Sequence, residues 1–111
     1  MSALLDQHCT PLRGDNNRLG PEAIERLLTQ IPEWSLSVGG SFISRGFRFA
    51  DYALTIVFVN AVAAMADEQD HHPELQVSYG RCEVRYNTHD VGGLSVNDFI
   101  CAAKADALAA A

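Results

Sequence analysis

The longest helical pattern of the chain lies in residues 51–73, which read DYALTIVFVNAVAAMADEQDHHP. Asp51 is a favourable N-cap residue, and the residues after it are apolar on most sides of a helix. Pro73 disfavours helical backbone at the residue before it. We therefore expect a helix over residues 52–69 that ends just before His71 and His72.

This central helix carries little polar surface, and such a helix is normally covered on more than one face. We expect one face to pack on a sheet and another to meet a second copy of the chain in an oligomer. The alternative, a tightly wrapped monomer, is difficult in 111 residues. The apolar run from Ala53 to Ala66 is too short for a membrane span, which needs roughly 20 residues, so no membrane partner is expected.

The part of the chain before this helix predicts a second helix and a hairpin. Residues 1–20 are rich in turn formers and are expected to be irregular. Apolar side chains recur at steps of three and four in residues 21–32, which predicts a helix that ends at the proline. Residues 34–49 alternate as two strands, with a two-residue turn at Gly39-Gly40 and a candidate bulge at Gly46.

The part after the central helix repeats this order. Residues 75–79 and 82–89 alternate as two strands joined by a turn at Gly80-Arg81. Residues 95–98 have the form of a capping box and predict a last helix over residues 99–111. We therefore expect a single α+β domain over the whole chain, in the order α-β-β-α-β-β-α, with an antiparallel four-stranded sheet and helices packed on one face.

Composition excludes several classes of function. The formal net charge is −6, and the 8 basic residues are scattered, which disfavours nucleic acid as a partner. Cys9, Cys82 and Cys101 are widely spaced, so we expect no disulfide framework, which suits a protein of the reducing cytosol. We expect Cys82 and Cys101 to lie in the core. The N-terminus lacks the basic and long apolar regions of a signal peptide, which favours a cytoplasmic location.

The histidines are the strongest candidates for chemistry. Imidazole moves protons near neutral pH because its ordinary pKa is roughly 6.5. His71 and His72 stand among carboxylates such as Asp67 and Asp70, and strand alternation places His89 on the polar side of its strand. One imidazole that protonates a leaving hydroxyl and another that removes a neighbouring proton would together perform a dehydration.

Other interpretations stay open at this point. The histidine pair can be ordinary polar loop surface, and Asp98 can be only a helix cap. A metal site can be drawn with His89 and Asp70, although adjacent histidines rarely bind one ion and the H-x-x-x-H spacing is absent. The chain has no phosphate-binding glycine loop and no serine in a nucleophile elbow.

Over nearly its whole length, the chain resembles bacterial members of the pterin-4a-carbinolamine dehydratase family (4a-hydroxytetrahydrobiopterin dehydratases). The resemblance rests on Asp70-His71-His72-Pro73-Glu74, Tyr79, Thr88-His89-Asp90, Gly93-Leu94-Ser95 and Asp98, with Cys9-Thr10-Pro11, Ile31-Pro32-Glu33-Trp34 and the Phe47/Phe49 strand in addition. The pairing of HHP with a downstream TH-x-x-x-GLS-x-x-D is specific. The family often has a tryptophan where this chain has Leu75.

The resemblance implies an α+β sandwich whose dimer forms an extended sheet, so a homodimer or homotetramer is expected. It implies removal of water from 4a-hydroxytetrahydrobiopterin, or a related 4a-hydroxytetrahydropterin, to give the quinonoid dihydropterin. This reaction recycles the cofactor of aromatic amino acid hydroxylases, which suggests a functional link to phenylalanine hydroxylase. The family uses no metal, and the pterin is the substrate rather than a cofactor.

The resemblance also implies site residues. The catalytic histidines fall on His71, His72 and His89, and the pterin-binding residues are Asp70, His71, His72, Asn87, Thr88, His89 and Asp90. Asp67 and Asp98 are expected to support the imidazoles, and a carboxylate partner would raise an imidazole pKa and favour the acid role. We assign proton transfer to His72 and His89 and positioning to His71.

One alternative function follows from the same resemblance. Some family members serve as a transcription-factor dimerisation partner in animals or as assembly factors in bacteria and plastids. An interaction protein built on the same oligomeric scaffold is therefore the alternative to the enzyme, and the complete set of three histidines favours the enzyme.

Overall fold

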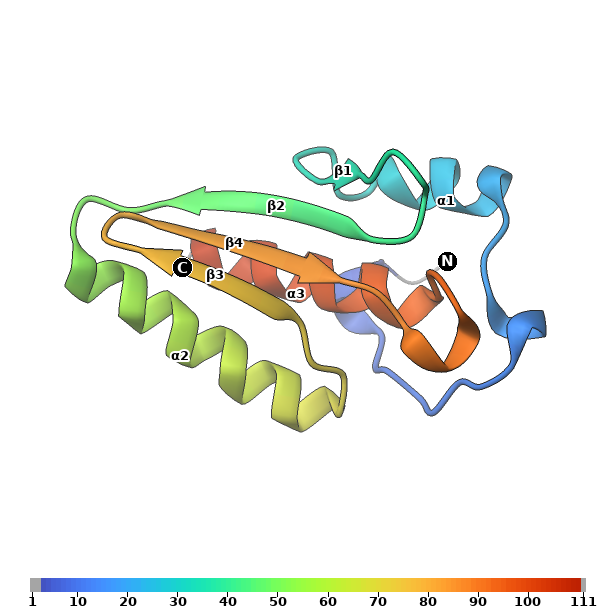
Figure 1. The fold of residues 1–111 in the computed structure, drawn as a ribbon. Helices are drawn as coiled ribbons and strands as arrows, with labels where there is room; N and C mark the ends of the chain where they lie inside the picture. Colours follow the sequence, from blue (N-terminus) through green and yellow to red (C-terminus); the bar gives the residue numbers. More distant parts are fainter. Residues whose placement is uncertain (1–2, 111) are drawn as a thin grey trace.

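A computed structural model describes residues 3–110 of the protein, and Figure 1 shows its fold. Helices and strands follow one another in the predicted order. Their bounds are α1 Pro21–Leu28, β1 Ser35–Leu36, β2 Ile43–Arg48, α2 Tyr52–Gln69, β3 Glu74–Ser78, β4 Arg81–Tyr86 and α3 Val96–Ala110, with short 3-10 helices at Leu4–Asp6, Asp15–Asn17 and His89–Val91. The predicted irregular N-terminal segment includes Met1 and Ser2, and the predicted last helix includes Ala111; these three residues lie outside the described part.

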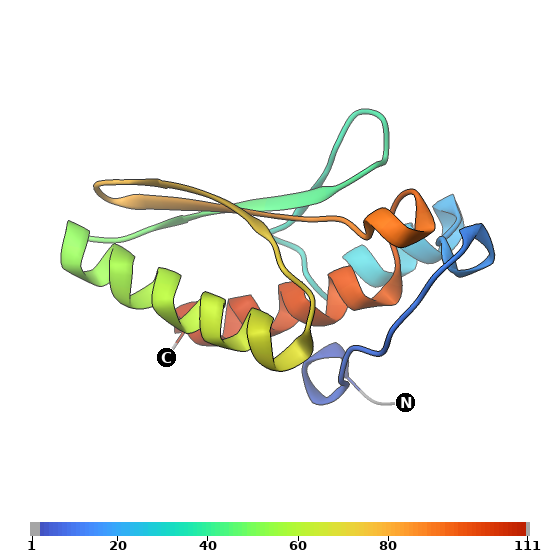
Figure 2. The same ribbon diagram turned by 60° about the horizontal axis from the view of Figure 1, so that its bottom comes forward.

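The strands form one antiparallel sheet in the order β1-β2-β4-β3. β4 lies inside the sheet and pairs with β2 over its whole length, from Arg81 opposite Arg48 to Tyr86 opposite Ile43. Figure 2 shows α2 and α3 on the same face of this sheet. The predicted α+β fold with helices on one face is confirmed.

The core lies between the sheet and the two long helices. Alternate side chains of β4 point into it, and Val84 and Tyr86 have no exposed surface. Phe58 and Val62 of α2 meet them from the helical layer, in line with the strand period of two and the helix period of 3.6. Cys82 and Cys101 are fully buried, so the prediction of two core thiols is confirmed. No helix among residues 3–110 is long and apolar enough to cross a bilayer.

Helix α2 begins and ends as predicted. The side chain of Asp51 accepts a hydrogen bond from the backbone N–H of Leu54 at 2.8 Å, which caps the first turn. After Gln69, Asp70 takes the left-handed conformation with φ of 51°, and the chain leaves the helix. His71 therefore lies just beyond the helix end, where its backbone N–H still donates to the carbonyl of Ala66 at 3.1 Å.

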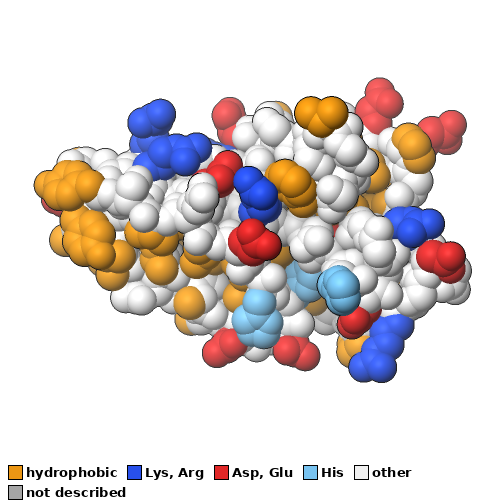
Figure 3. Space-filling view, viewed as in Figure 1, with side chains coloured by type: hydrophobic (Ala, Val, Ile, Leu, Met, Phe, Trp, Pro, Cys, Tyr) orange, Lys and Arg blue, Asp and Glu red, His pale blue; other side chains and the backbone are white. Residues whose placement is uncertain are grey.

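The outer side of α2 is apolar and uncovered. Tyr52, Leu54 and Val57 are each at least half exposed, and Tyr79 in the β3–β4 turn stacks beside Tyr52. Figure 3 shows apolar side chains gathered over this end of the molecule. The oligomer stays a prediction, and these four residues are the surface that it would cover.

The predicted two-residue turn at Gly39-Gly40 is wrong. β1 and β2 pair only at Ser35–Ser44 and Leu36–Ile43, so the connection contains residues 37–42. The backbone N–H of Ser37 still donates to the carbonyl of Phe42, but the hydroxyl of Ser37 accepts from the backbone N–H groups of Ser41 and Phe42, so this side chain takes part of the bonding that a tight hairpin would have.

Two smaller expectations also need correction. No bulge occurs at Gly46, which pairs in register with Glu83; its missing Cβ instead leaves room for the guanidinium of Arg81 across the sheet. Helix α1 ends at Leu28 rather than at the proline, because the next three N–H groups bond to carbonyls three residues back. This tighter turn ends the α-helix before Pro32 is reached.

Candidate active site

His71 and Asp98 form the buried centre of the site. His71 follows α2, Asp98 lies in the first turn of α3, and their Nε2 and Oδ1 atoms are 2.6 Å apart. The histidine side chain is 12% exposed and the aspartate is fully buried. Two elements distant in sequence therefore meet through one charge-assisted contact.

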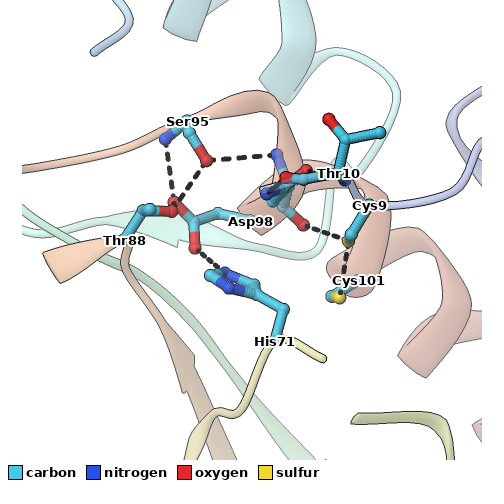
Figure 4. Close-up of polar contacts among 8 residues, drawn as sticks. Cys9, Thr10, His71, Thr88, Ser95, Asp98 and Cys101 are labelled. Atoms are coloured by element: carbon cyan, nitrogen blue, oxygen red, sulfur yellow. Dashed lines mark hydrogen bonds and ion pairs between the residues drawn. The ribbon is translucent and has the colours of Figure 1, made fainter. Parts of the chain in front are cut away.

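The second carboxylate oxygen of Asp98 is also fixed by hydrogen bonds. Its Oδ2 accepts hydrogen bonds from the backbone N–H of Ser95 at 2.9 Å and from the hydroxyl of Thr88 at 2.8 Å. Because the Thr88 proton is used here, the Ser95 hydroxyl donates to Thr88 Oγ1 at 2.7 Å. Figure 4 shows this network. The carboxylate half of the predicted capping box is confirmed, whereas the hydroxyl of Ser95 accepts from the N–H of Asn97 rather than of Asp98. The same carboxylate also holds His71.

The surroundings of His71 raise its pKa above the ordinary value of 6.5. Burial alone would lower the pKa, but the hydrogen bond and charge of Asp98 outweigh it, and the charges of Cys9 and Asp70 add to the increase. The ring also stacks on Tyr86 at the end of β4. His71 is thus fixed in orientation and favours the imidazolium form.

His72 has a carboxylate partner of a different kind. Its Nε2 lies 2.9 Å from Asp67 Oδ1, and both side chains are largely exposed, at 59% and 85%. Water screens a pair of this type, so it orients the ring weakly. The sequence prediction that Asp67 and Asp98 stand beside the histidines agrees with these contacts.

His89 lies outside β4, although the alternation of residues 82–89 placed it in that strand. β4 ends at Tyr86, three residues earlier than expected, and His89 begins the 3-10 helix His89–Val91. Thr88 forms an isolated bridge with Gly93, which turns the chain out of the sheet. His89 is exposed as predicted, but the loop conformation places it there rather than strand parity.

The predicted substrate-binding residues line one pocket. It has a volume of about 290 Å³ and is lined by Asp70, His71, His72, Asn87, Thr88, His89 and Asp90. These are the seven residues that the sequence predicts to bind substrate. Polar side chains that converge in a cavity of this size suit a small polar ligand. Among residues 3–110, no three His, Cys, Asp or Glu side chains are arranged to hold a metal ion.

His71 also borders a second cavity, which the sequence did not indicate. This cavity has a volume of about 370 Å³, and Cys9, Thr10, Pro11, Leu12 and Arg13 of the N-terminal segment form one of its walls. The segment is anchored on both long helices. The backbone N–H of Cys9 donates to Gln69 Oε1 at 2.8 Å, and the Asn97 amide donates to the carbonyl of Thr10 at 2.7 Å.

The fold and the site together define a small α+β protein with a histidine pocket at one end of its sheet. The family model for pterin 4 alpha carbinolamine dehydratase matches residues 17–108. The chain therefore belongs to this family. The N-terminal wall of the second cavity lies outside the matched residues.

Relatives with similar sequences agree with this assignment. A protein of Stenotrophomonas maltophilia named "Putative pterin-4-alpha-carbinolamine dehydratase" is 55% identical over 105 residues, which are 95% of this chain and 90% of the relative. A Xanthomonas campestris protein of the same name is 57% identical over 98 residues, covering 88% of this chain and 83% of the relative.

Solved structures share the fold. The transcriptional coactivator/pterin dehydratase from Brucella melitensis superposes with a TM-score of 0.81 at 32% identity, over 84% of this chain and 99% of that one. A pterin dehydratase-like protein identified as a RuBisCO assembly factor in the alpha-carboxysome gives a TM-score of 0.61 at 26% identity, over 69% and 89%.

Proposed function

We propose that the protein is a dehydratase that removes water from 4a-hydroxytetrahydrobiopterin or a related 4a-hydroxytetrahydropterin. The observation that carries the proposal is the single pocket in which three imidazoles converge in different environments. His71 is buried against a carboxylate, whereas His72 and His89 are exposed. A buried imidazole paired with a carboxylate and exposed imidazoles in the same pocket can supply an acid and a base together.

In the proposed reaction, the C4a–O bond breaks while the leaving oxygen takes a proton and departs as water. N5 loses its proton to a base, and the electron pair of that N–H bond forms the double bond between N5 and C4a. The product is the quinonoid dihydropterin, so the reaction would recycle the cofactor of aromatic amino acid hydroxylases. A phenylalanine hydroxylase is the functional partner that this chemistry suggests.

We assign the acid role to His71. Its raised pKa favours the imidazolium, and Asp98 holds Nε2, which leaves the proton on Nδ1 for the substrate. His89 is assigned as the base, because its ring has no hydrogen-bond partner among the described residues and is free to accept a proton. His72, paired with Asp67, would orient the pterin. This division differs from the sequence prediction, which gave positioning to His71.

The test is turnover of freshly generated 4a-hydroxytetrahydropterin, followed by absorbance against the uncatalysed dehydration. We expect acceleration by the native protein and a loss of 10²–10⁴-fold, the usual range for one acid or base, in His71→Gln and in His89→Gln. His8→Gln removes the remaining histidine, which lies outside the pocket, and should retain turnover. No acceleration by folded protein would contradict the proposal.

The alternative, an interaction or assembly protein, is supported by the uncovered apolar surface of Tyr52, Leu54, Val57 and Tyr79. Two structural neighbours carry non-enzymatic roles in their names, coactivator and RuBisCO assembly factor. A homodimer or homotetramer would cover the same surface. The His89→Gln variant separates the functions, because it would abolish dehydration and leave assembly through this surface unchanged.

A further inference from the structure

Two cysteine thiols face each other beside the site. Cys9 Sγ lies 3.5 Å from Cys101 Sγ and 3.6 Å from the carbonyl oxygen of Asn97, to which a thiol can donate. Cys101 is fully buried in α3, one turn beyond Asp98, whereas Cys9 is partly exposed in the wall of the second cavity. Figure 4 shows the two sulfurs beside the network that holds His71.

We propose that Cys9 and Cys101 are a reversible thiol–disulfide pair that a peroxide oxidises and a dithiol reduces. The Cys9 thiolate attacks one oxygen of the peroxide, the O–O bond breaks, and a sulfenic acid forms with release of water. The Cys101 sulfur then attacks the Cys9 sulfur, the S–O bond breaks, and a second water leaves. Two thiol hydrogens and two electrons pass to the peroxide.

The geometry requires only a small movement. A disulfide has an S–S distance of about 2.05 Å, so the two sulfurs must approach by about 1.5 Å. Cys101 is fixed by the packing of α3 in the core. Cys9 lies in irregular backbone anchored through Gln69 and Asn97, and such backbone adjusts more easily than a packed helix.

The two thiols differ in the way that such a pair requires. The contact with the Cys101 thiol lowers the pKa of Cys9 and outweighs its partial burial, and the charge of His71 acts in the same direction. The contact with Cys9 and burial raise the pKa of Cys101. Cys9 is also the partly exposed thiol of the two and Cys101 is fully buried, so Cys9 meets the oxidant and Cys101 resolves the sulfenic acid. Burial raises the pKa of Cys82, which makes it an internal reference.

A disulfide between Cys9 and Cys101 would change the surroundings of His71. Cys9 and His71 line the same cavity, and the N–H of Cys9 is held by Gln69, two residues before His71. A disulfide would draw this wall towards α3. The protein would then carry an oxidation-sensitive segment directly against its buried histidine, whatever reaction the pocket performs.

Peptide mapping tests the pair directly, because trypsin places each cysteine on a peptide of its own. Cleavage after basic residues gives residues 1–13 with Cys9, 82–85 with Cys82 and 86–104 with Cys101. Folded protein is treated with hydrogen peroxide, alkylated under denaturing conditions and digested. We expect a linked peptide of residues 1–13 and 86–104 that disappears after dithiothreitol, while Cys82 is alkylated before and after.

Three variants complete the design. Cys82→Ala should give the same linked peptide. Cys101→Ala should leave a Cys9 sulfenic acid that a dione probe captures, and Cys9→Ser, at the partly exposed position, should give no linked peptide and no captured product. Three alkylated thiols after peroxide treatment, or a disulfide between two chains, would overturn the proposal.

Discussion

The aromatic ring of Tyr86 lies nearly parallel to the imidazole of His71, with ring centroids 5.4 Å apart and an angle of 15° between the planes. Tyr86 is the last residue of β4 and is fully buried, so it provides a rigid surface under the histidine. Asp98 holds the same ring from its edge. The two contacts together leave His71 little rotational freedom, which a positioned acid requires.

Two substitutions of Tyr86 test the contributions of its ring and of its hydroxyl separately. The hydroxyl is buried and interacts with the thiol of Cys101, a weak hydrogen-bonding group, rather than with a strong partner, so Tyr86→Phe should keep stability within about 1 kcal/mol and retain turnover. Tyr86→Leu removes the stacked ring and should lower stability by about 2–4 kcal/mol, with loss of turnover. Urea unfolding and initial rates measure both effects; equal behaviour of the two variants would show that stacking is unimportant.

Loss of the Asp98 charge should lower the stability of the folded protein. Asp98→Asn retains one acceptor oxygen for three donors and leaves the His71 imidazolium without its partner, so we expect a loss of about 2–4 kcal/mol in the free energy of unfolding. Asp67→Asn is the matched control, because its contact with His72 is exposed and should matter by less than about 1 kcal/mol. Similar losses in both variants would contradict the buried role of Asp98.

Stability should depend on pH through His71. Because its pKa in the folded protein is raised, the stabilisation is fully present below the unfolded value of 6.5 and is lost as pH rises through the folded pKa. The difference in unfolding free energy between the native protein and His71→Gln should therefore shrink with increasing pH above 6.5. Urea titrations over a pH series measure it, and a constant difference would refute the raised pKa.

The apolar surface on α2 predicts an assembly. Leu54→Glu should convert an oligomer to a smaller species without unfolding, because this side chain is half exposed within one chain and makes no core contact. Leu5→Glu, also exposed but in the N-terminal 3-10 helix Leu4–Asp6, is the control and should leave assembly unchanged. Sedimentation velocity measures both variants. A native protein that sediments as a monomer would remove the oligomer from the proposal.

The parts of the fold that were predicted well are those set by neighbouring residues. The cap at Asp51 and the stop before Pro73 determine the ends of α2 within a few residues of themselves. The β1–β2 connection was mispredicted because the hydroxyl of Ser37 takes over backbone hydrogen bonds, a choice that the double glycine does not reveal. Local turn statistics do not register such a side chain.

The site also has a part that the sequence predicted and a part that it missed. The family resemblance supplied all seven residues of the histidine pocket, although His89 reaches it through a 3-10 helix rather than a strand. The second cavity was missed because its wall depends on contacts between distant residues, such as Thr10 with Asn97 and Cys9 with Gln69. No periodic pattern encodes such contacts, and only the Cys9-Thr10-Pro11 match hinted at a role for this segment.

The histidine pocket and the uncovered apolar surface lie at opposite ends of α2, and Figure 3 shows the apolar side chains at one edge of the molecule and the histidines nearer its middle. The pocket is formed after α2 and after β4, whereas Tyr52 and Tyr79 lie at the start of α2 and in the β3–β4 turn. Substitutions at one end therefore need not disturb the other. Natural selection can discard catalysis in such a scaffold and retain its contacts, or alter its contacts and retain catalysis, by changing a few residues at a time.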